Sequence, residues 1–132
     1  MLSLAAVIAL AVGGCGSQGS APRTAVAGWS QNHQTIHLHV GDRLNVTLDS
    51  TYFQIPASSD ESVLAPDGPG SVQAAAPSDR CRPGVGCGTV SRRFRAVKAG
   101  AAVVNSHRDS CGEVLRCTSD LAEFQIDVIV DT

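Results

Sequence analysis

Alternation of apolar and polar residues with a period of two most restricts how this chain can fold. Residues 35–40, 43–48 and 123–130 each place an apolar side chain at every second position. This period puts the apolar residues on one face of a β-strand, whereas a helix would need a period near 3.6. The sequence therefore predicts half-buried strands. The side chains expected in the core are Ile36, Leu38, Val40, Leu44, Val46, Leu48, Phe124, Ile126, Val128 and Val130.

Weaker strand signals occupy the middle of the chain. Residues 89–97 keep their apolar residues on one parity, but Arg92 interrupts the set and indicates an edge strand or a bulge. Residues 101–107 form a small-residue strand, and residues 51–55 form a short candidate that Pro56 ends. Residues 65–80 are rich in Pro and Gly, which is loop composition.

The number and spacing of these segments indicate the fold class. Six to seven short strands with no amphipathic helices between them favour an all-β, antiparallel, immunoglobulin-like sandwich over a βαβ fold. A chain of 132 residues suits one ordinary domain. We assign residues 35–132 to this β-sandwich domain.

The N-terminal residues carry a different pattern, an apolar run over residues 2–14 that ends at Cys15. Val12-Gly13-Gly14-Cys15 resembles the lipobox of bacterial lipoproteins, in which a peptidase cleaves before the cysteine and a lipid is attached to it. The run is shorter than the roughly 20 residues of a spanning helix, which favours a cleaved signal. No Lys or Arg precedes it, unlike an ordinary export signal.

This resemblance implies where in the cell the protein is located. We expect a signal peptide over residues 1–14, a lipid on Cys15 and a flexible tether over residues 15–34, whose first part is rich in Gly and Ser. The domain would then be held at the extracytoplasmic face of the cell membrane. Cleavage without lipidation, or burial of the apolar run in the domain, are the two alternatives.

The other four cysteines predict two disulfides, because an exported chain meets oxidising conditions. A four-thiolate zinc site is the alternative, but its cysteine pairs are usually separated by two to four residues and here five intervene. Three pairings are possible. We favour Cys81 with Cys87 and Cys111 with Cys117, since each pair brackets a turn-rich loop.

Charge and motif content argue against several classes of function. The formal net charge of −2 supplies no field for binding nucleic acid. The chain has no Gly-x-Ser-x-Gly nucleophile motif, and a cysteine in a disulfide has no thiolate with which to attack. We expect a monomeric protein that is not an enzyme and needs no cofactor.

Two clusters of polar residues remain candidates for binding. His33, His37 and His39 lie close in sequence and could hold copper or zinc, although a solvated strand face is the favoured interpretation. His107 is interpreted as structural or exposed. A basic cluster is the other candidate, as a solvated face or a site for an acidic partner; its members are Arg92, Arg93 and Arg95.

The order of features from Gly41 onward resembles that of the chagasin-type inhibitors of papain-like cysteine proteases, which are small immunoglobulin-like sandwiches. Residues 41–48 resemble the strand before that family's first inhibitory loop, and residues 49–53 take the position of that loop. Residues 84–88 fit the Gly-x-Gly of the second loop. Residues 108–110 take the position of the third, without its Pro and Trp. The resemblance implies contact residues at Thr51, Tyr52, Phe53, Gly84, Gly86, Gly88 and Arg108.

These observations lead to one main functional hypothesis and two alternatives. The main hypothesis is a lipid-anchored, non-enzymatic sandwich that binds a protein or another envelope component through disulfide-shaped loops. The resemblance implies the first alternative, an inhibitor of papain-like cysteine proteases. The second is an envelope protein that binds metal through its histidines.

Overall fold

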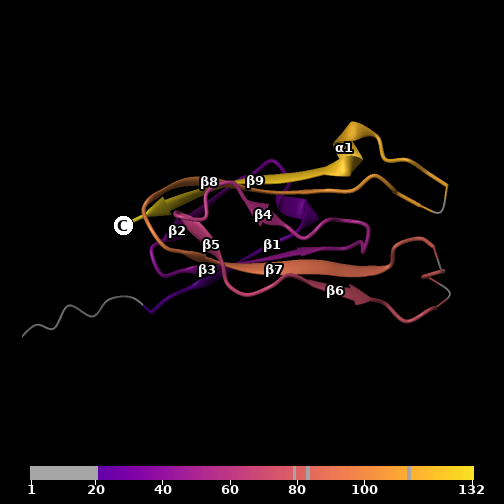
Figure 1. The fold of residues 1–132 in the computed structure, drawn as a ribbon, viewed down its shortest axis with the longest axis horizontal. Helices are drawn as coiled ribbons and strands as arrows, with labels where there is room; N and C mark the ends of the chain where they lie inside the picture. Colours follow the sequence, from indigo (N-terminus) through magenta and orange to yellow (C-terminus); the bar gives the residue numbers. More distant parts are fainter. Residues whose placement is uncertain (1–20, 79, 83, 113) are drawn as a thin grey trace, which may run out of the picture.

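The computed structural model describes residues 21–78, 80–82, 84–112 and 114–132, and these fold into two β-sheets packed face to face (Figure 1). The predicted signal peptide, the lipidation site Cys15 and the first part of the tether lie outside the described residues. One sheet has the strand order β1-β3-β7-β5, with β6 also paired to β7, and the other has the order β2-β9-β8-β4. The bounds are β1 Thr24–Ala27, β2 Thr35–His39, β3 Arg43–Leu48, β4 Ala57–Ser58, β5 Leu64–Pro66, β6 Ser71–Ala74, β7 Gly88–Ala96, β8 Gly100–His107 and β9 Glu123–Asp131.

The predicted fold class is confirmed, and the alternation explains why the sheets pack as they do. Inward residues of β3, β7, β8 and β9 meet between the sheets and form one core. Of the side chains predicted to be buried, Ile36 is only partly buried and Val40, just beyond the end of β2, is 46% exposed. The side chains of that core with no exposed surface include Leu44, Val46, Leu48, Val90, Phe94, Val104, Phe124, Ile126 and Val128.

The sheets are mixed rather than purely antiparallel. β1 runs parallel to β3, and β2 runs parallel to β9, while the other five pairings are antiparallel. A hairpin can join only antiparallel neighbours, so parallel pairs need a longer crossing. Here the chain crosses between sheets through the short 3-10 helix η1, Trp29–Gln31, so neither parallel pair is consecutive in sequence.

Three sequence predictions about element boundaries are wrong, and the first is the short strand over residues 51–55, which is part of the β3–β4 loop. The predicted tether of residues 15–34 contains β1, and Ala27 of that strand is fully buried, so the folded domain begins before residue 35. The predicted loop of residues 65–80 contains most of β5 and all of β6, which pair with the two halves of β7. Both strands are held by their neighbours rather than by strong strand propensity of their own.

Arg92 lies neither at an edge nor in a bulge. β7 is an internal strand whose pairing with β3 continues without interruption from Val90 to Arg95. Arg92 shares the inward parity of Val90 and Phe94, is partly buried, and donates a hydrogen bond from Nη1 to the carbonyl oxygen of Pro56 at 3.3 Å. The predicted basic cluster is therefore divided between the two faces of the sheet.

Helical structure is a minor component of the described residues. Besides η1, it consists of one turn, α1 Ser119–Ala122, immediately before β9. Among the residues that the structure describes, no helix is long and apolar enough to cross a membrane.

Candidate functional site

Three loops lie together at one end of the sandwich, on the right in Figure 1. They are the β3–β4 loop, residues 49–56, the β6–β7 loop, residues 75–87, and the β8–β9 loop, residues 108–118. Residue 21 and the C-terminus lie at the other end. All seven contact residues predicted from the sequence lie in these loops or directly beside them, so the fold gathers segments that are far apart in the sequence.

The first two loops are fastened to each other by their backbones and by one aromatic side chain. The amide of Thr51 donates to the carbonyl oxygen of Gly86 at 2.9 Å, and the hydroxyl of Tyr52 donates to the carbonyl oxygen of Gly84. A Cβ on Gly86 would lie 2.6 Å from Cδ2 of Tyr52, and Gly86 has a φ of +70°. Gly86 is therefore required both by the backbone conformation and by the close approach of the tyrosine ring.

The predicted residues in these two loops differ in their exposure. Phe53 is buried, with 6% of its surface exposed, so it supports the first loop from below instead of offering its ring to a partner. Thr51 and Tyr52 are half-buried, and Gly84 is exposed. A shallow hollow of about 320 Å³ between the loops is lined in part by Thr51, Tyr52 and Gly84. This hollow is the surface that the first two loops present to solvent.

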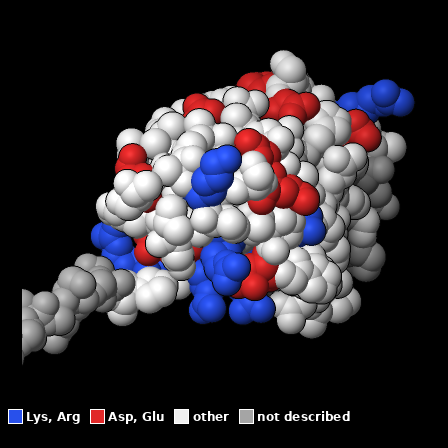
Figure 2. Space-filling view, turned by 60° about the vertical axis from the view of Figure 1, so that its left-hand side comes forward, with Lys and Arg blue, Asp and Glu red and all other residues white. Residues whose placement is uncertain are grey.

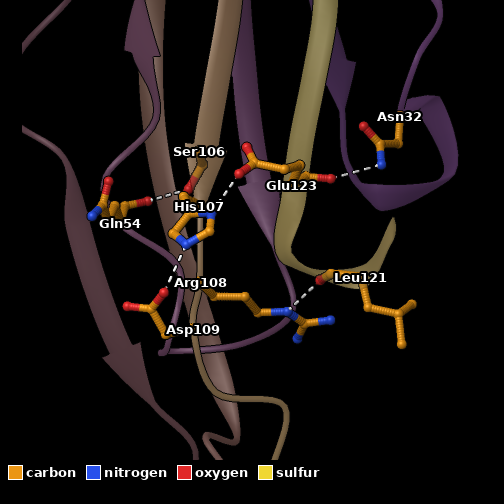
Figure 3. Close-up of polar contacts among 8 residues, drawn as sticks. All are labelled: Asn32, Gln54, Ser106, His107, Arg108, Asp109, Leu121 and Glu123. Carbon is orange, nitrogen blue, oxygen red and sulfur yellow. Dashed lines mark hydrogen bonds and ion pairs between the residues drawn. The ribbon is translucent and has the colours of Figure 1, made fainter. Parts of the chain in front are cut away.

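Arg108 attaches the third loop to the first. Its guanidinium carbon lies 4.5 Å from the ring centroid of Phe53 and 5.6 Å from that of Trp29. Its Nε donates to the carbonyl oxygen of Leu121 at 2.9 Å (Figure 3). Burial lowers the pKa of this guanidinium, which nevertheless stays protonated at neutral pH. Arg108 therefore packs as a cation on aromatic rings and holds the loop base in place.

Trp29 is a member of this cluster that sequence reasoning did not connect with the site. Its ring centroid lies 5.8 Å from that of Phe53 and 6.5 Å from that of Phe124. It comes from η1, twenty residues before the start of the first loop, so sequence spacing alone does not relate it to the loops. The only signal for Trp29 in the sequence was that the chain contains a single tryptophan.

The predicted disulfide pairing is confirmed. Cys81 is bonded to Cys87, with 5.8 Å between their Cα atoms, and Cys111 is bonded to Cys117, with 4.9 Å between theirs. Each bond closes a ring inside one loop and joins neither loop to the core. The disulfides therefore restrict the shape of the second and third loops.

The ring of the third loop presents two apolar side chains to solvent. Val114 is 100% exposed and Leu115 is 64% exposed. The turn is held by a hydrogen bond of 2.8 Å from the amide of Cys111 to the carbonyl oxygen of Leu115. Sequence reasoning missed this pair, although two adjacent apolar residues inside a short disulfide ring were a usable signal. Exposed apolar residues held in a closed ring are suited to enter a pocket of a partner.

His107 is placed between two carboxylates at the base of the third loop (Figure 3). Its Nδ1 lies 2.6 Å from Oε1 of Glu123, and its Nε2 lies 2.8 Å from Oδ1 of Asp109. Hydrogen bonds first to Asp109 and then to Glu123 raise the pKa of His107 above its usual value of 6.5. The cluster joins the start of the loop to the first residue of β9, which agrees with the structural role expected for His107.

The three other histidines do not form one cluster. His37 and His39 are exposed on β2, where Nδ1 of His37 lies 4.0 Å from Oδ2 of Asp131 and Nδ1 of His39 lies 3.9 Å from Oδ2 of Asp42. His33 lies in the turn before that strand with a φ of +64°. In the parts of the chain with described coordinates, no three His, Cys, Asp or Glu side chains are grouped so that they could hold a metal ion.

Comparison with solved structures shows which fold this is. The crystal structure of the cysteine protease inhibitor EhICP2 from Entamoeba histolytica superimposes with a TM-score of 0.58 at 10% identity, covering 86% of this chain and all of that one. The chain has a chagasin-type fold. The solution structure of amebosin matches with a TM-score of 0.50 at 15% identity, covering 83% of this chain and 99% of the other. No family model and no curated protein sequence matches the chain.

Within this chagasin-type fold, the third loop differs most from the pattern that the sequence resemblance suggested. Arg108 is in the expected position, but it packs inward on Phe53 and Trp29. The exposed apolar residues of the loop are Val114 and Leu115, inside the disulfide ring. The outer surface of the loop is therefore formed by Val114 and Leu115 and not by Arg108, the residue to which the resemblance pointed.

Proposed function

We propose that this protein is a non-enzymatic inhibitor of papain-like cysteine proteases that acts through the three loops at one end of the sandwich. The observation that carries the proposal is the convergence of three braced loops at one end of a chagasin-type fold. The similar structure from Entamoeba histolytica is named a cysteine protease inhibitor. The likeness supports the fold directly, and the loop geometry supports the function.

The bracing of the loops favours tight binding to a cleft. A loop that is already ordered loses less conformational freedom when it binds, so more of the contact energy remains as affinity. Here the first loop is tied to the second by Thr51 and Tyr52, and the third is tied to the first by Arg108. Two disulfide rings restrict the loops further.

The apolar pair Val114 and Leu115 is the proposed anchor in the protease. Interfaces obtain most of their binding energy from a few residues that become fully buried in pockets of the partner. The chain lacks the Pro and Trp that the family resemblance led us to look for in the third loop, and these two side chains project from the same loop. Val114 and Leu115 would replace that tryptophan as the side chains of the loop that become buried on binding.

Titration against papain tests this proposal. The full chain with Cys15→Ser, which has no lipidation site, should inhibit papain or a related protease with a 1:1 stoichiometry. Val114→Asp with Leu115→Asp should weaken inhibition by about 100-fold, because a buried anchor pair contributes roughly 3 kcal/mol. Val26→Asp, on β1 and 70% exposed, is the matched control and should inhibit like the parent. Absence of inhibition across a panel of papain-like proteases would refute the proposal.

Attachment to the cell membrane through a lipid on Cys15 is the second part of the proposal. The lipobox-like sequence supports it, and so does the arrangement in Figure 1, in which residue 21 lies at the end opposite the loops. A tether at that end leaves the loops free to meet a partner. The wild-type chain should fractionate with membranes in a bacterial host that processes lipoproteins, and Cys15→Ala should appear in the soluble fraction. Equal membrane content of both would contradict lipidation at Cys15.

A different protein of the cell envelope is the alternative partner. The observation that favours it is the disulfide ring with an apolar tip, which departs from the family pattern in the third loop. Capture from an envelope extract with the same Cys15→Ser chain would identify such a partner. If the captured protein no longer binds the Val114→Asp, Leu115→Asp variant, and papain-like proteases are not inhibited, the binding function stands with a different target.

A further inference from the structure

The outer face of the β1-β3-β7-β5 sheet carries three arginines that the proposed function does not use. β7 alternates between the two faces, so that Arg93 and Arg95 are exposed on the outside while Phe94 and Ala96 are buried. Arg43 of β3 is exposed and lies directly opposite Arg95 in the pairing register. We call Arg43, Arg93 and Arg95 the arginine face.

The stability of the fold does not explain this arrangement. Like charges directly opposite each other on neighbouring strands destabilise a sheet. Nε of Arg43 lies 3.6 Å from Oδ2 of Asp67, but among the described residues no carboxylate forms an ion pair with Arg93 or Arg95. The chain as a whole has a net charge of −2, so the positive field here is local. Such a field is suited to bind an anion outside the domain.

The arginine face adjoins the point where the described chain begins. A shallow hollow of about 460 Å³ is lined by Arg43 and Arg95 and also by Pro22, Val40 and Gly41. Figure 2 shows several Lys and Arg side chains along the lower edge of the molecule, with some acidic side chains beside them. Arg23, whose side chain is 71% exposed, also lies at this end, but its Nη2 is 3.9 Å from Oδ2 of Asp42, so its charge is partly compensated.

The short N-terminal connection restricts how far this face can move from a membrane. Six peptide units join Cys15 to Ala21, and a fully extended chain of that length reaches about 20 Å. Since Pro22 lines the same hollow as Arg43 and Arg95, a lipid on Cys15 would keep these arginines close to the head groups. An anionic bilayer attracts Lys and Arg only within about one Debye length of its surface. The arginines can therefore contribute to membrane binding only if the anchor holds them near that surface.

We infer that the arginine face binds the anionic phospholipid head groups of the membrane to which the chain is tethered, and so fixes the orientation of the domain on the bilayer. This inference rests on the proposed lipid attachment. One lipid anchor combined with a basic surface binds membranes more firmly than either one alone. Each arginine near the surface should contribute about fivefold to the affinity for an anionic bilayer.

The experiment uses the full chain with Cys15→Ser, so that no lipid obscures the contribution of the arginines. Binding is measured by co-sedimentation with vesicles of equimolar phosphatidylglycerol and phosphatidylcholine, and with vesicles of phosphatidylcholine alone. Arg93→Gln with Arg95→Gln should bind the anionic vesicles about 30-fold more weakly. The matched control is Arg82→Gln with Arg116→Gln, which removes two exposed arginines from the loops at the far end. The control should bind like its parent.

Three results would overturn the inference. Equal loss of binding in the two double variants would mean that total charge, rather than this face, attracts the vesicles. Equal binding of the parent to both kinds of vesicle would mean that the apolar run of residues 2–14 is responsible. Tighter binding to poly-L-glutamate than to anionic vesicles would indicate a soluble acidic protein partner. None of these results bears on lipidation, which the fractionation of wild type against Cys15→Ala tests separately.

Discussion

The guanidinium carbon of Arg108 lies 4.5 Å from the ring centroid of Phe53, and this contact couples the third loop to the first. Phe53 is buried and Arg108 is half-buried, so the cation is partly removed from water over the face of the ring. Trp29 completes the cluster from a segment that precedes both loops. The relative position of the two loops therefore depends on one charged side chain and two aromatic rings.

Replacement of Arg108 should loosen this coupling. Arg108→Ala removes the packing on Phe53 and the hydrogen bond to Leu121, so we expect the free energy of unfolding to fall by about 1–2 kcal/mol. Chemical denaturation followed by tryptophan fluorescence measures this directly, because Trp29 lies in the same cluster. Arg116→Ala, an exposed change in the same loop, is the control and should leave the stability unchanged. Equal stability of the two variants would show that the contact with Phe53 contributes nothing.

The approach of Tyr52 to Gly86 gives a second prediction. Gly86 and Gly68 both have a positive φ, but only at Gly86 would a Cβ meet another side chain. Gly68→Ala should lower the free energy of unfolding by about 1 kcal/mol through backbone strain alone. Gly86→Ala should lower it further and should also weaken binding of a partner, because the tyrosine ring must move. If the two variants behave alike in denaturation and in protease titration, Tyr52 does not brace the second loop.

Removal of the disulfide in the third loop should affect binding more than folding. For a ring of this size the chain-entropy model gives about 2 kcal/mol of stabilisation. Cys111→Ser with Cys117→Ser should therefore still fold, with a lower thermal midpoint. Its inhibition of a papain-like protease should be at least tenfold weaker, since Val114 and Leu115 would no longer be preorganised. If the variant is less stable but inhibits equally well, the disulfide ring does not contribute to binding by Val114 and Leu115.

The two carboxylates around His107 predict a specific dependence of stability on pH. They raise the pKa of the folded-state histidine above 6.5, so the protonated ring stabilises the fold. This stabilisation is fully present below the unfolded pKa and is lost as the pH rises through the folded pKa. The difference in unfolding free energy between wild type and His107→Gln should therefore decrease from acidic to alkaline pH. Urea denaturation of both proteins over this range provides the measurement, and a constant difference would contradict the prediction.

Much of the fold could be predicted because large apolar residues alternate in β3 and β9, where burial of one face decides the structure. β1 could not be predicted, because Thr24, Ala25, Val26 and Ala27 are mostly small, and the strand depends on its pairing with β3. β6 is exposed along its whole length and likewise depends on β7. Alternation reports burial, so strands that bury little leave no such signal.

The candidate site could be predicted only in part, for a related reason. The family resemblance pointed to Tyr52, Gly86 and Arg108, which lie in the loops, and the spacing of the cysteines gave the two disulfides. Sequence reasoning missed Trp29, which enters the cluster from η1, and it missed the exposed pair Val114 and Leu115. Contacts between segments that are distant in the sequence depend on the packing of the two sheets, which no local pattern specifies.

The parallel pairing of β1 with β3 has a mechanical consequence. β1 begins at the end where residue 21 lies and runs toward the loops, alongside β3. If a bound protease pulled on the loops while the proposed lipid anchor held the opposite end, the force would run along the length of β1. The hydrogen bonds between β1 and β3 would then be loaded together in shear, instead of breaking one after another. The pairing of β1 with β3 is therefore placed to resist separation of the two strands while the loops hold a protease.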